Sequence, residues 1–254
     1  MSALARSAFS LTAVSLLIAL GFAASARRTS QIVHVGRTEV RLITIAGAGG
    51  ATYFHPHENE HTSAAVTRAF VREKGGTLLE IQSKGARLIS FTLAGAKYAF
   101  DPNRMFTDTG LRQSLANHSR YSEAAAIAVR SLRNVVLSDL KRSGGPIVAV
   151  HNNARDGMTI DDYRQGGRFA KEAKRVAANP SAGPHDFFLV LDEKLFSKLE
   201  HFGFNVVLQT QTPTDDGSLS VYCGQHGLRY INIEAGDGHA SEQKRMLEAL
   251  RPLL

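Results

Sequence analysis

Cysteine is almost absent from this chain of 254 residues. The only one, Cys223, has no partner for an intramolecular disulfide and stands far from the N-terminus, where a lipid-anchoring cysteine would lie. Internal repeats, low-complexity tracts and long linkers rich in proline, glycine or serine are also missing. At this length, with 43% hydrophobic residues, the chain can bury one substantial core. We therefore expect a single domain over residues 27–254.

Two common binding signatures are missing as well. The glycine cluster at residues 47–50 lacks the Walker lysine and the G-x-G-x-x-G spacing, so phosphate binding is not expected. The net charge is +7, but the basic residues are scattered, and the longest cluster, Lys171 to Arg175, is typical of the solvated face of a helix. We therefore expect no nucleic-acid partner.

The first 26 residues have the layout of a secretory signal peptide. They contain one charged residue, Arg6, then an apolar run through Leu16–Leu20, and they end in Ala24-Ser25-Ala26, small residues that suit a cleavage site. The alternative is an uncleaved N-terminal anchor, because the apolar segment approaches spanning length. In both cases the remainder faces an exported compartment, so we expect a periplasmic or secreted protein that touches a membrane only through that segment.

The rest of the chain alternates between strand-like and helix-like segments. Such alternation predicts an α/β three-layer sandwich with a mixed, mostly parallel sheet. The expected strands are 31–35, 39–46, 51–55, 77–82, 87–93, 147–150, 187–191, 205–209 and 229–234. The expected helices are 60–74, 122–141, 193–202 and 240–250, with 161–178 helical at least in part.

Metal-capable side chains are concentrated between Tyr53 and His61, where two zinc motifs overlap. One is His55-x-x-Glu58, which needs a third ligand from elsewhere in the chain. The other is His57-Glu58-x-x-His61, in which two histidines on one helix face bind zinc and the glutamate is the base. The spacing alone does not choose between them.

The surrounding sequence favours the first motif. Pro56 indicates that a helix is only beginning at His57, whereas H-E-x-x-H normally lies well inside one. The second motif would take Glu73 or Glu80 as its third ligand and would leave His151 and Glu234 without roles.

Three predicted strand ends carry reactive groups, and α/β sheets bind ligands at strand ends. These are His55 with Glu58, then His151, then Glu234. Two histidines and a carboxylate make a three-ligand zinc shell with the fourth position open for water, as catalysis requires. Glu234 could then take and return a proton. Each residue alone is also compatible with an ordinary strand-end, core or capping role.

The order of these motifs resembles the zinc carboxypeptidase superfamily, and most of all its branch with succinylglutamate desuccinylase and aspartoacylase. The motifs are His55-x-x-Glu58, then Asp101-Pro-Asn-Arg-Met-Phe106, then His151, then Ile233-Glu234, across roughly residues 40 to 240. The resemblance implies that His55, Glu58 and His151 bind Zn2+ and that Glu234 is the general base. It also implies that Asn103 and Arg104 bind a substrate carboxylate.

This chain departs from the family at two points. Pro56-His57 follows the first histidine, where the family usually has a small residue or glycine. The arginine that polarises the substrate carbonyl is also not fixed by a motif: Arg87 is our candidate, and Lys97 and Arg112 are its rivals.

The Asn103-Arg104 pair has a chemical rationale of its own, because a guanidinium binds a carboxylate through two parallel hydrogen bonds and the amide adds a donor. We therefore expect an exported zinc-dependent hydrolase, a carboxypeptidase or amidase that cleaves an amide bond next to a free carboxylate in peptides, cell-wall peptides among them. One alternative is an N-acyl amino acid deacylase. Another is a catalytically inactive peptide-binding protein.

Overall fold

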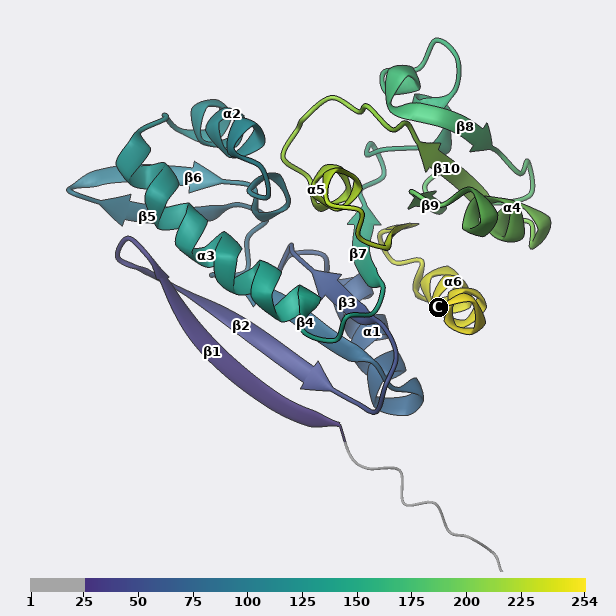
Figure 1. Cartoon of the computed structure of the whole chain (residues 1–254), viewed down its shortest axis with the longest axis horizontal. Helices are drawn as coiled ribbons and strands as arrows, with labels where there is room; N and C mark the ends of the chain where they lie inside the picture. Colours follow the sequence, from purple (N-terminus) through teal and green to yellow (C-terminus); the bar gives the residue numbers. More distant parts are fainter. Residues whose placement is uncertain (1–25) are drawn as a thin grey trace, which may run out of the picture.

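A computed structural model describes residues 26–254 (Figure 1). The predicted signal peptide, residues 1–26, therefore lies outside the described residues except for Ala26. The strands are β1 (Arg27–Val35), β2 (Thr38–Ala46), β3 (Thr52–His55), β4 (Thr77–Gln82), β5 (Ile89–Leu93), β6 (Ala96–Phe100), β7 (Ile147–Asn153), β8 (Ala173–Ala177), β9 (Phe187–Val190), β10 (Asn205–Gln209) and β11 (Tyr230–Gly236). The helices are α1 (His61–Lys74), α2 (Asp108–His118), α3 (Glu123–Lys141), α4 (Glu193–His201), α5 (Leu219–Gln225) and α6 (Ala240–Leu250), with short 3-10 turns η1 (Pro102–Arg104), η2 (Ile160–Tyr163), η3 (Ala170–Glu172) and η4 (Arg251–Leu253).

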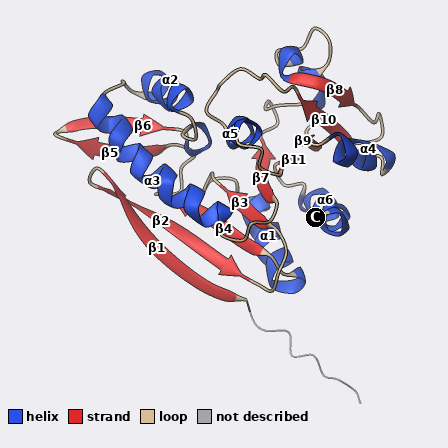
Figure 2. Ribbon diagram, in the orientation of Figure 1, coloured by secondary structure: helices blue, strands red, loops and turns tan. Residues whose placement is uncertain are grey.

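The described strands other than β5 and β6 form one nine-stranded sheet in the order β1-β2-β4-β3-β7-β11-β9-β10-β8 (Figure 2). The central strands β4, β3, β7 and β11 are parallel to their neighbours in that run. Antiparallel pairing adds β1 and β2 at one edge and β8 at the other, and β9 also runs antiparallel to β11. The predicted α/β class with a mixed sheet is confirmed, and its parallel part is the centre.

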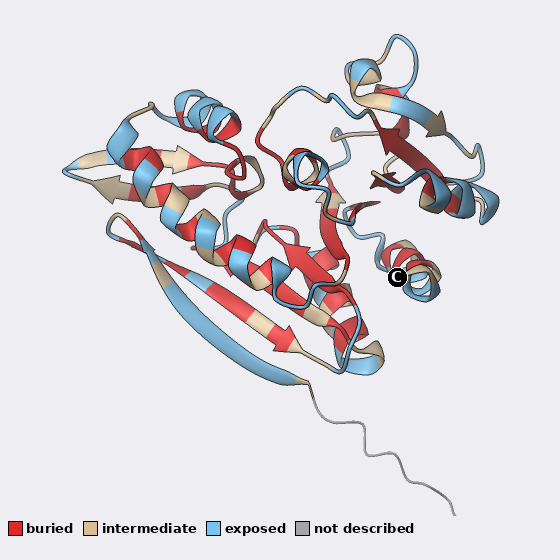
Figure 3. Ribbon diagram, viewed as in Figure 1, coloured by how far each residue is buried: buried red, intermediate tan, exposed pale blue. Residues whose placement is uncertain are grey.

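Helices cover both faces of this sheet, so the predicted three layers are present. Along β7, Ile147 and Ala149 face one apolar cluster while Val148 and Val150 face the other, because successive strand residues point to opposite faces. The first cluster includes the buried faces of α2, α3 and α5, and the second those of α1, α4 and α6. The central strands are accordingly buried along their length, whereas β1 is mostly exposed (Figure 3).

Outside the main sheet, β5 and β6 form a two-stranded hairpin that leads directly into the site. Ala94 and Gly95, with φ of 48° and 80°, connect the two strands in the left-handed geometry that suits a tight hairpin turn. Asp101 follows β6 and accepts a hydrogen bond from the backbone N–H of Asn103 at 2.8 Å, which shapes η1. The hairpin therefore delivers Asp101, Asn103 and Arg104 to one end of the sheet.

The prediction that residues 161–178 are helical at least in part holds only for two short 3-10 turns. This segment contains η2, η3 and β8 in place of a helix, so the basic cluster Lys171 to Arg175 spans η3 and an edge strand. The cause is tertiary: β8 pairs antiparallel with β10, far along the chain. The prediction also did not include β6, α2 and α5. Among residues 26–254, no helix has the length and apolar character needed to cross a bilayer.

Candidate metal centre

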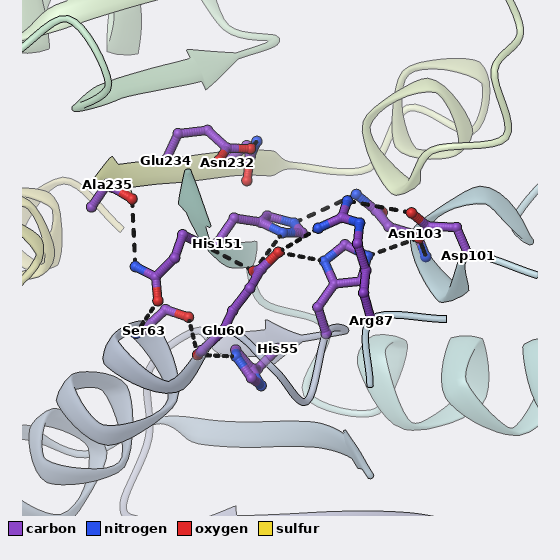
Figure 4. A network of polar contacts seen from close by, with 12 residues as sticks. His55, Glu60, Ser63, Arg87, Asp101, Asn103, His151, Asn232, Glu234 and Ala235 are labelled. Carbon is purple, nitrogen blue, oxygen red and sulfur yellow. Dashed lines mark hydrogen bonds and ion pairs between the residues drawn. The ribbon is translucent and has the colours of Figure 1, made fainter. Parts of the chain in front are cut away.

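Three buried side chains, from His57, Glu60 and His151, converge at the carboxyl ends of the central strands. Figure 4 shows Glu60 and His151 among their polar neighbours. Each offers one ligand atom, and these atoms all lie within 4.8 Å of one another, which makes this the one such cluster within residues 26–254. Nδ1 of His57 is 2.8 Å from Oε1 of Glu60, and Nδ1 of His151 is 3.2 Å from Oε2 of the same carboxylate. The three side chains are 0 to 5% exposed.

The topology of the sheet explains why residues so far apart in the chain meet. β3 and β7 are parallel neighbours, so their carboxyl ends open at the same edge. His57 lies in the turn after β3, Glu60 immediately precedes α1, and His151 lies near the end of β7. The backbone N–H of Asn152 also donates to Oε2 of Glu60 at 3.1 Å, which ties the turn to β7.

The structure does not bring His55 and Glu58, the predicted ligand pair, together with His151. His55 follows Tyr53 and Phe54 in β3, and strand alternation puts it on the Tyr53 face, opposite to the Phe54 and His151 face. Its Nε2 lies 2.9 Å from the carbonyl oxygen of Glu60, and burial lowers its pKa to about 4. The cluster instead contains His57-x-x-Glu60, a pair that lies two positions further along the chain than the predicted His55-x-x-Glu58.

Glu58 has a different role. Its carboxylate accepts hydrogen bonds from the backbone N–H groups of Ser83 and Gly85, at 2.5 and 2.7 Å, so it braces the turn after β4. The H-E-x-x-H alternative also fails geometrically, because His61 is exposed at the start of α1 while His57 precedes the helix. Glu73, one of its two candidate third ligands, pairs with Lys74, and Glu80, the other, pairs with Arg68.

Asp101 orients His57 from the other side of the ring. Its Oδ1 is 2.7 Å from Nε2 of His57, which leaves Nδ1 to face Glu60. Burial favours a neutral ring, but the carboxylates of Glu60 and Asp101 outweigh burial and raise the pKa of His57 to about 9. The interaction also changes the pKa of the two acids. Burial alone would raise the pKa of Glu60 and of Asp101, but the neighbouring histidine charge outweighs burial and holds both pKa values well below the usual range. Sequence motifs did not assign Asp101 a role.

The donor set fits a metal ion. Nδ1 of His57 is buried and close to Glu60 Oε1, yet the pair lacks hydrogen-bond geometry, so this nitrogen has no hydrogen-bond partner among the described residues. Ligands of a tetrahedral zinc, at about 2.0 to 2.2 Å from the ion, lie about 3.3 Å from one another, close to the spacing between Glu60 and each histidine. Two imidazoles and one carboxylate are also a ligand set of catalytic zinc. A carboxylate behind a ligating histidine, as Asp101 is behind His57, commonly fixes its tautomer.

Glu234 lies beside this cluster on the neighbouring strand. It is in register with His151 across β7 and β11, and only 4% of the residue is exposed. Burial raises its pKa above that of an ordinary glutamate, with Glu60 acting in the same direction, while His151 and a 2.9 Å hydrogen bond from Asn232 oppose the rise. A carboxyl group whose pKa is raised in this way can accept and return a proton.

Arg87, Lys97 and Arg112 are the candidates for the residue that polarises the substrate carbonyl, and of these three Arg87 reaches the cluster. Its guanidinium is 2.8 Å from Oε1 of Glu60 and 3.3 Å from Oδ2 of Asp101, and the side chain is half exposed. Arg112 instead stacks on the ring of Tyr121, and Lys97 lies exposed on β6. Arg87 is therefore free on one side to meet a bound molecule.

Asn103 and Arg104 belong to η1, which lies beside the cluster. Nδ2 of Asn103 is 3.5 Å from Nε2 of His151, and its Oδ1 accepts a hydrogen bond from the N–H of Leu219 at 3.3 Å. The guanidinium of Arg104 donates to the carbonyl of Asn103 and lies 3.5 Å from Asp216. Both side chains are only partly buried, so they form an accessible polar rim.

Several solved structures are similar to this chain. Murein-tripeptide amidase MpaA from Escherichia coli O157 has a TM-score of 0.42 and 16% identity, with 86% of this chain and 90% of that chain covered. Thrombin activatable fibrinolysis inhibitor has a TM-score of 0.47 and 10% identity, with 88% and 70% covered. A protein from Shewanella denitrificans OS-217 described as a candidate carboxypeptidase A has a TM-score of 0.42 and 10% identity, with 88% and 64% covered.

No protein-family model and no curated protein sequence matches the chain. At these identities and TM-scores, the likeness to solved structures assigns neither a substrate nor a reacting residue to this protein. The site itself has to carry the functional interpretation.

Proposed function

We propose that this protein is a zinc-dependent hydrolase that cleaves an amide bond adjacent to a free carboxylate. The single observation that carries the proposal is the convergence of His57, Glu60 and His151, all buried, next to a fourth buried group, Glu234. Buried carboxyl groups with a raised pKa are concentrated at functional sites, and Glu234 is such a group.

The residues at the site would have separate roles in this reaction. His57, Glu60 and His151 would hold zinc, which when bound supplies a Lewis acid and lowers the pKa of a coordinated water. Asp101 keeps His57 in the tautomer that presents Nδ1. Glu234 takes a proton from water and returns it to the departing amine. Arg87 is placed to donate hydrogen bonds to the carbonyl oxygen as negative charge develops there.

Asn103 and Arg104 support the second part of the proposal, that the substrate ends in a carboxylate. Arg104 offers a planar donor fork at the accessible rim, and the side-chain amide of Asn103 lies 3.5 Å from His151. The free carboxylate would dock at this rim and so set the distance from the chain end to the bond that is cut. We further propose that the substrates are peptides of the cell envelope, in keeping with the signal-like layout of residues 1–26.

The first experiment is elemental analysis of purified protein for zinc, with His57→Ala and His151→Ala as test variants. His61→Ala is the matched control, since His61 is an exposed histidine four residues from His57. We expect about one zinc per chain in the wild type and the control, and a large loss in both test variants, with folding checked by circular dichroism.

His55→Ala separates the two H-x-x-E pairs. Zinc retained in His55→Ala and lost in His57→Ala supports the cluster described above, and the reverse would overturn it. A wild type that binds no zinc and hydrolyses no peptide would refute the proposal and favour a peptide-binding protein.

A further inference from the structure

His239 lies against β11 on the same face as Glu234. Gly236 is two residues beyond Glu234 in the strand, so the two positions point to the same side of the sheet. A Cβ at Gly236 would be 2.6 Å from Nδ1 and 2.7 Å from Cε1 of His239. The imidazole thus fills the place of a side chain at position 236, about 6.6 Å along the strand from Glu234 at about 3.3 Å per residue.

Asp186 holds this ring in one orientation. Nδ1 of His239 is 2.9 and 3.0 Å from the two carboxylate oxygens of Asp186, and Oδ1 also accepts the backbone N–H of Gly236 at 2.8 Å. Asp186 is buried, whereas the side chain of His239 is 49% exposed. An ionised carboxylate only accepts hydrogen bonds, so the Nδ1 of a neutral His239 carries the proton and its Nε2 is an acceptor.

Nε2 of His239 has no hydrogen-bond partner among residues 26–254. The ring is therefore fixed at one nitrogen and open at the other, on the face of the sheet where Glu234 acts. A fixed acceptor of this kind selects a molecule that offers an N–H at the matching place.

The place of His239 relative to the rim decides which part of a substrate it would meet. In Figure 4, Ala235 and Asn103 lie on opposite sides of His151, and Gly236 follows Ala235 in the direction of the strand. A substrate whose carboxylate docks at Asn103 and Arg104 would have its scissile bond at the cluster. Its acyl half would then extend along β11 toward Gly236 and His239.

We propose that His239 is a specificity-determining residue whose Nε2 accepts a hydrogen bond from an N–H group on the acyl side of the scissile bond. This inference rests on the proposed function and narrows it: the acyl half is an aminoacyl unit of a peptide, in contrast to a simple acyl group such as acetyl or succinyl, which offers no such donor.

The test compares two substrates that differ in one group. One is an N-acetylglycyl amino acid, and the other is its acetoxyacetyl isostere, in which an oxygen replaces the glycine N–H. The wild type should prefer the first in kcat/KM by about tenfold, the value of one hydrogen bond of about 1.4 kcal/mol. His239→Phe, which keeps an aromatic ring without an acceptor, should bring the ratio to about one, and His201→Phe, a change at an exposed histidine of α4, should leave it unchanged.

Asp186→Asn tests the tautomer. The amide can donate to Nδ1, which moves the proton to Nε2 and turns the acceptor into a donor, so the preference for the N–H substrate should disappear or reverse. His239→Gln, whose side-chain carbonyl accepts hydrogen bonds, should keep part of the preference.

If Asp186 and His239 only fasten the turn between β11 and α6, each variant should slow both substrates equally and leave the ratio unchanged, and that result would overturn the proposal. Calorimetric dissociation constants for the same two compounds are measured in parallel. If neither compound is hydrolysed but the N–H compound binds about tenfold more tightly than its isostere, the proposed hydrolase activity is refuted and the role of His239 stands. If the two compounds have equal Kd values, the role of His239 is refuted.

Discussion

Nε2 of His57 lies 2.7 Å from Oδ1 of Asp101, and the same oxygen accepts the backbone N–H of Asn103 at 2.8 Å. One carboxylate thus orients a ligand of the candidate metal centre and shapes the turn that carries the candidate carboxylate-binding residues.

Asp101→Asn should weaken zinc binding. The amide oxygen can still accept the N–H of Asn103, but the variant loses the charge that favours Nε2–H on His57, and loss of such a partner typically costs 10- to 100-fold in metal affinity. Competition with a fluorescent chelator measures the change. Asp108→Asn, at an exposed acid in α2, is the control, and equal affinities for all three proteins would contradict the role of Asp101.

Glu234→Gln should retain zinc and lose turnover, with kcat lower by about 10² to 10⁴. The active form of Glu234 is the carboxylate, so activity should fall as pH drops through its pKa. Because burial raises that pKa, the acid limb of kcat/KM should lie above the ordinary glutamate value of 4.5. Asn232→Ala removes a hydrogen bond that lowers the pKa, so it should move this limb to still higher pH. A limb that does not respond to Asn232→Ala would assign the titration to another group.

Asp216→Asn should lower KM for substrates with a free carboxylate. Oδ2 of Asp216 is 3.5 Å from Nε of Arg104, and its charge opposes a second carboxylate at the same guanidinium. Pairs this exposed are worth about 0.2 to 1 kcal/mol, so the change should be about 1.4- to fivefold. A peptide amidated at its C-terminus serves as the control, since its KM should not respond. A higher KM would show that Asp216 mainly positions Arg104.

Arg68→Ala should destabilise the fold in a pH-dependent way. Glu80 on β4 is 1% exposed and pairs with Nε of Arg68 at 2.8 Å, so the variant leaves a buried carboxylate unpaired, at a cost of about 1 to 3 kcal/mol. Burial already raises the pKa of Glu80 above its unfolded value, and loss of Arg68 raises it further. A raised carboxyl pKa means that the folded state holds the proton more tightly.

The stability that the proton gives is therefore present at low pH and lost as pH rises through the folded pKa. Urea denaturation should accordingly show a larger loss for Arg68→Ala at pH 7 than at pH 4. Lys74→Ala, at the end of the same helix, should change little at either pH. Equal losses at both values would exclude Glu80 as the cause.

Most of the strands and helices were readable from the sequence because their residues follow the hydrophobic period of a strand or of a helix. The segment 77–82, for example, is a strand with the predicted bounds, and so is 205–209. Residues 161–178 could not be read in the same way: whether they form a helix or an edge strand depends on β10, which exists as a neighbour only after folding.

The sequence analysis assigned the candidate ligands to His55 and Glu58, whereas the structure clusters His57 and Glu60 with His151. His55-x-x-Glu58 and His57-x-x-Glu60 have identical spacing, so local sequence does not separate them. What separates them is the face of β3 on which His55 lies, and that face is defined by the pairing of Phe54 with Ala149. The sequence did contain one signal: alternation along the strand puts His55 on the face opposite to Phe54, and Pro56 ends the strand directly after His55. The partnership of Asp101 and His57 had no local signal, because it joins residues on different elements.

Glu60 and His151 are 91 positions apart in the chain, yet both belong to the candidate metal centre. An ion held there would act as a removable cross-link that closes a long loop spanning α1, the β5–β6 hairpin, α2 and α3. Such a bond restricts the unfolded chain more than the folded one. Loading and stripping the ion would then change how often this half of the protein opens to proteases, so metal supply would set the lifetime of the protein as well as its activity.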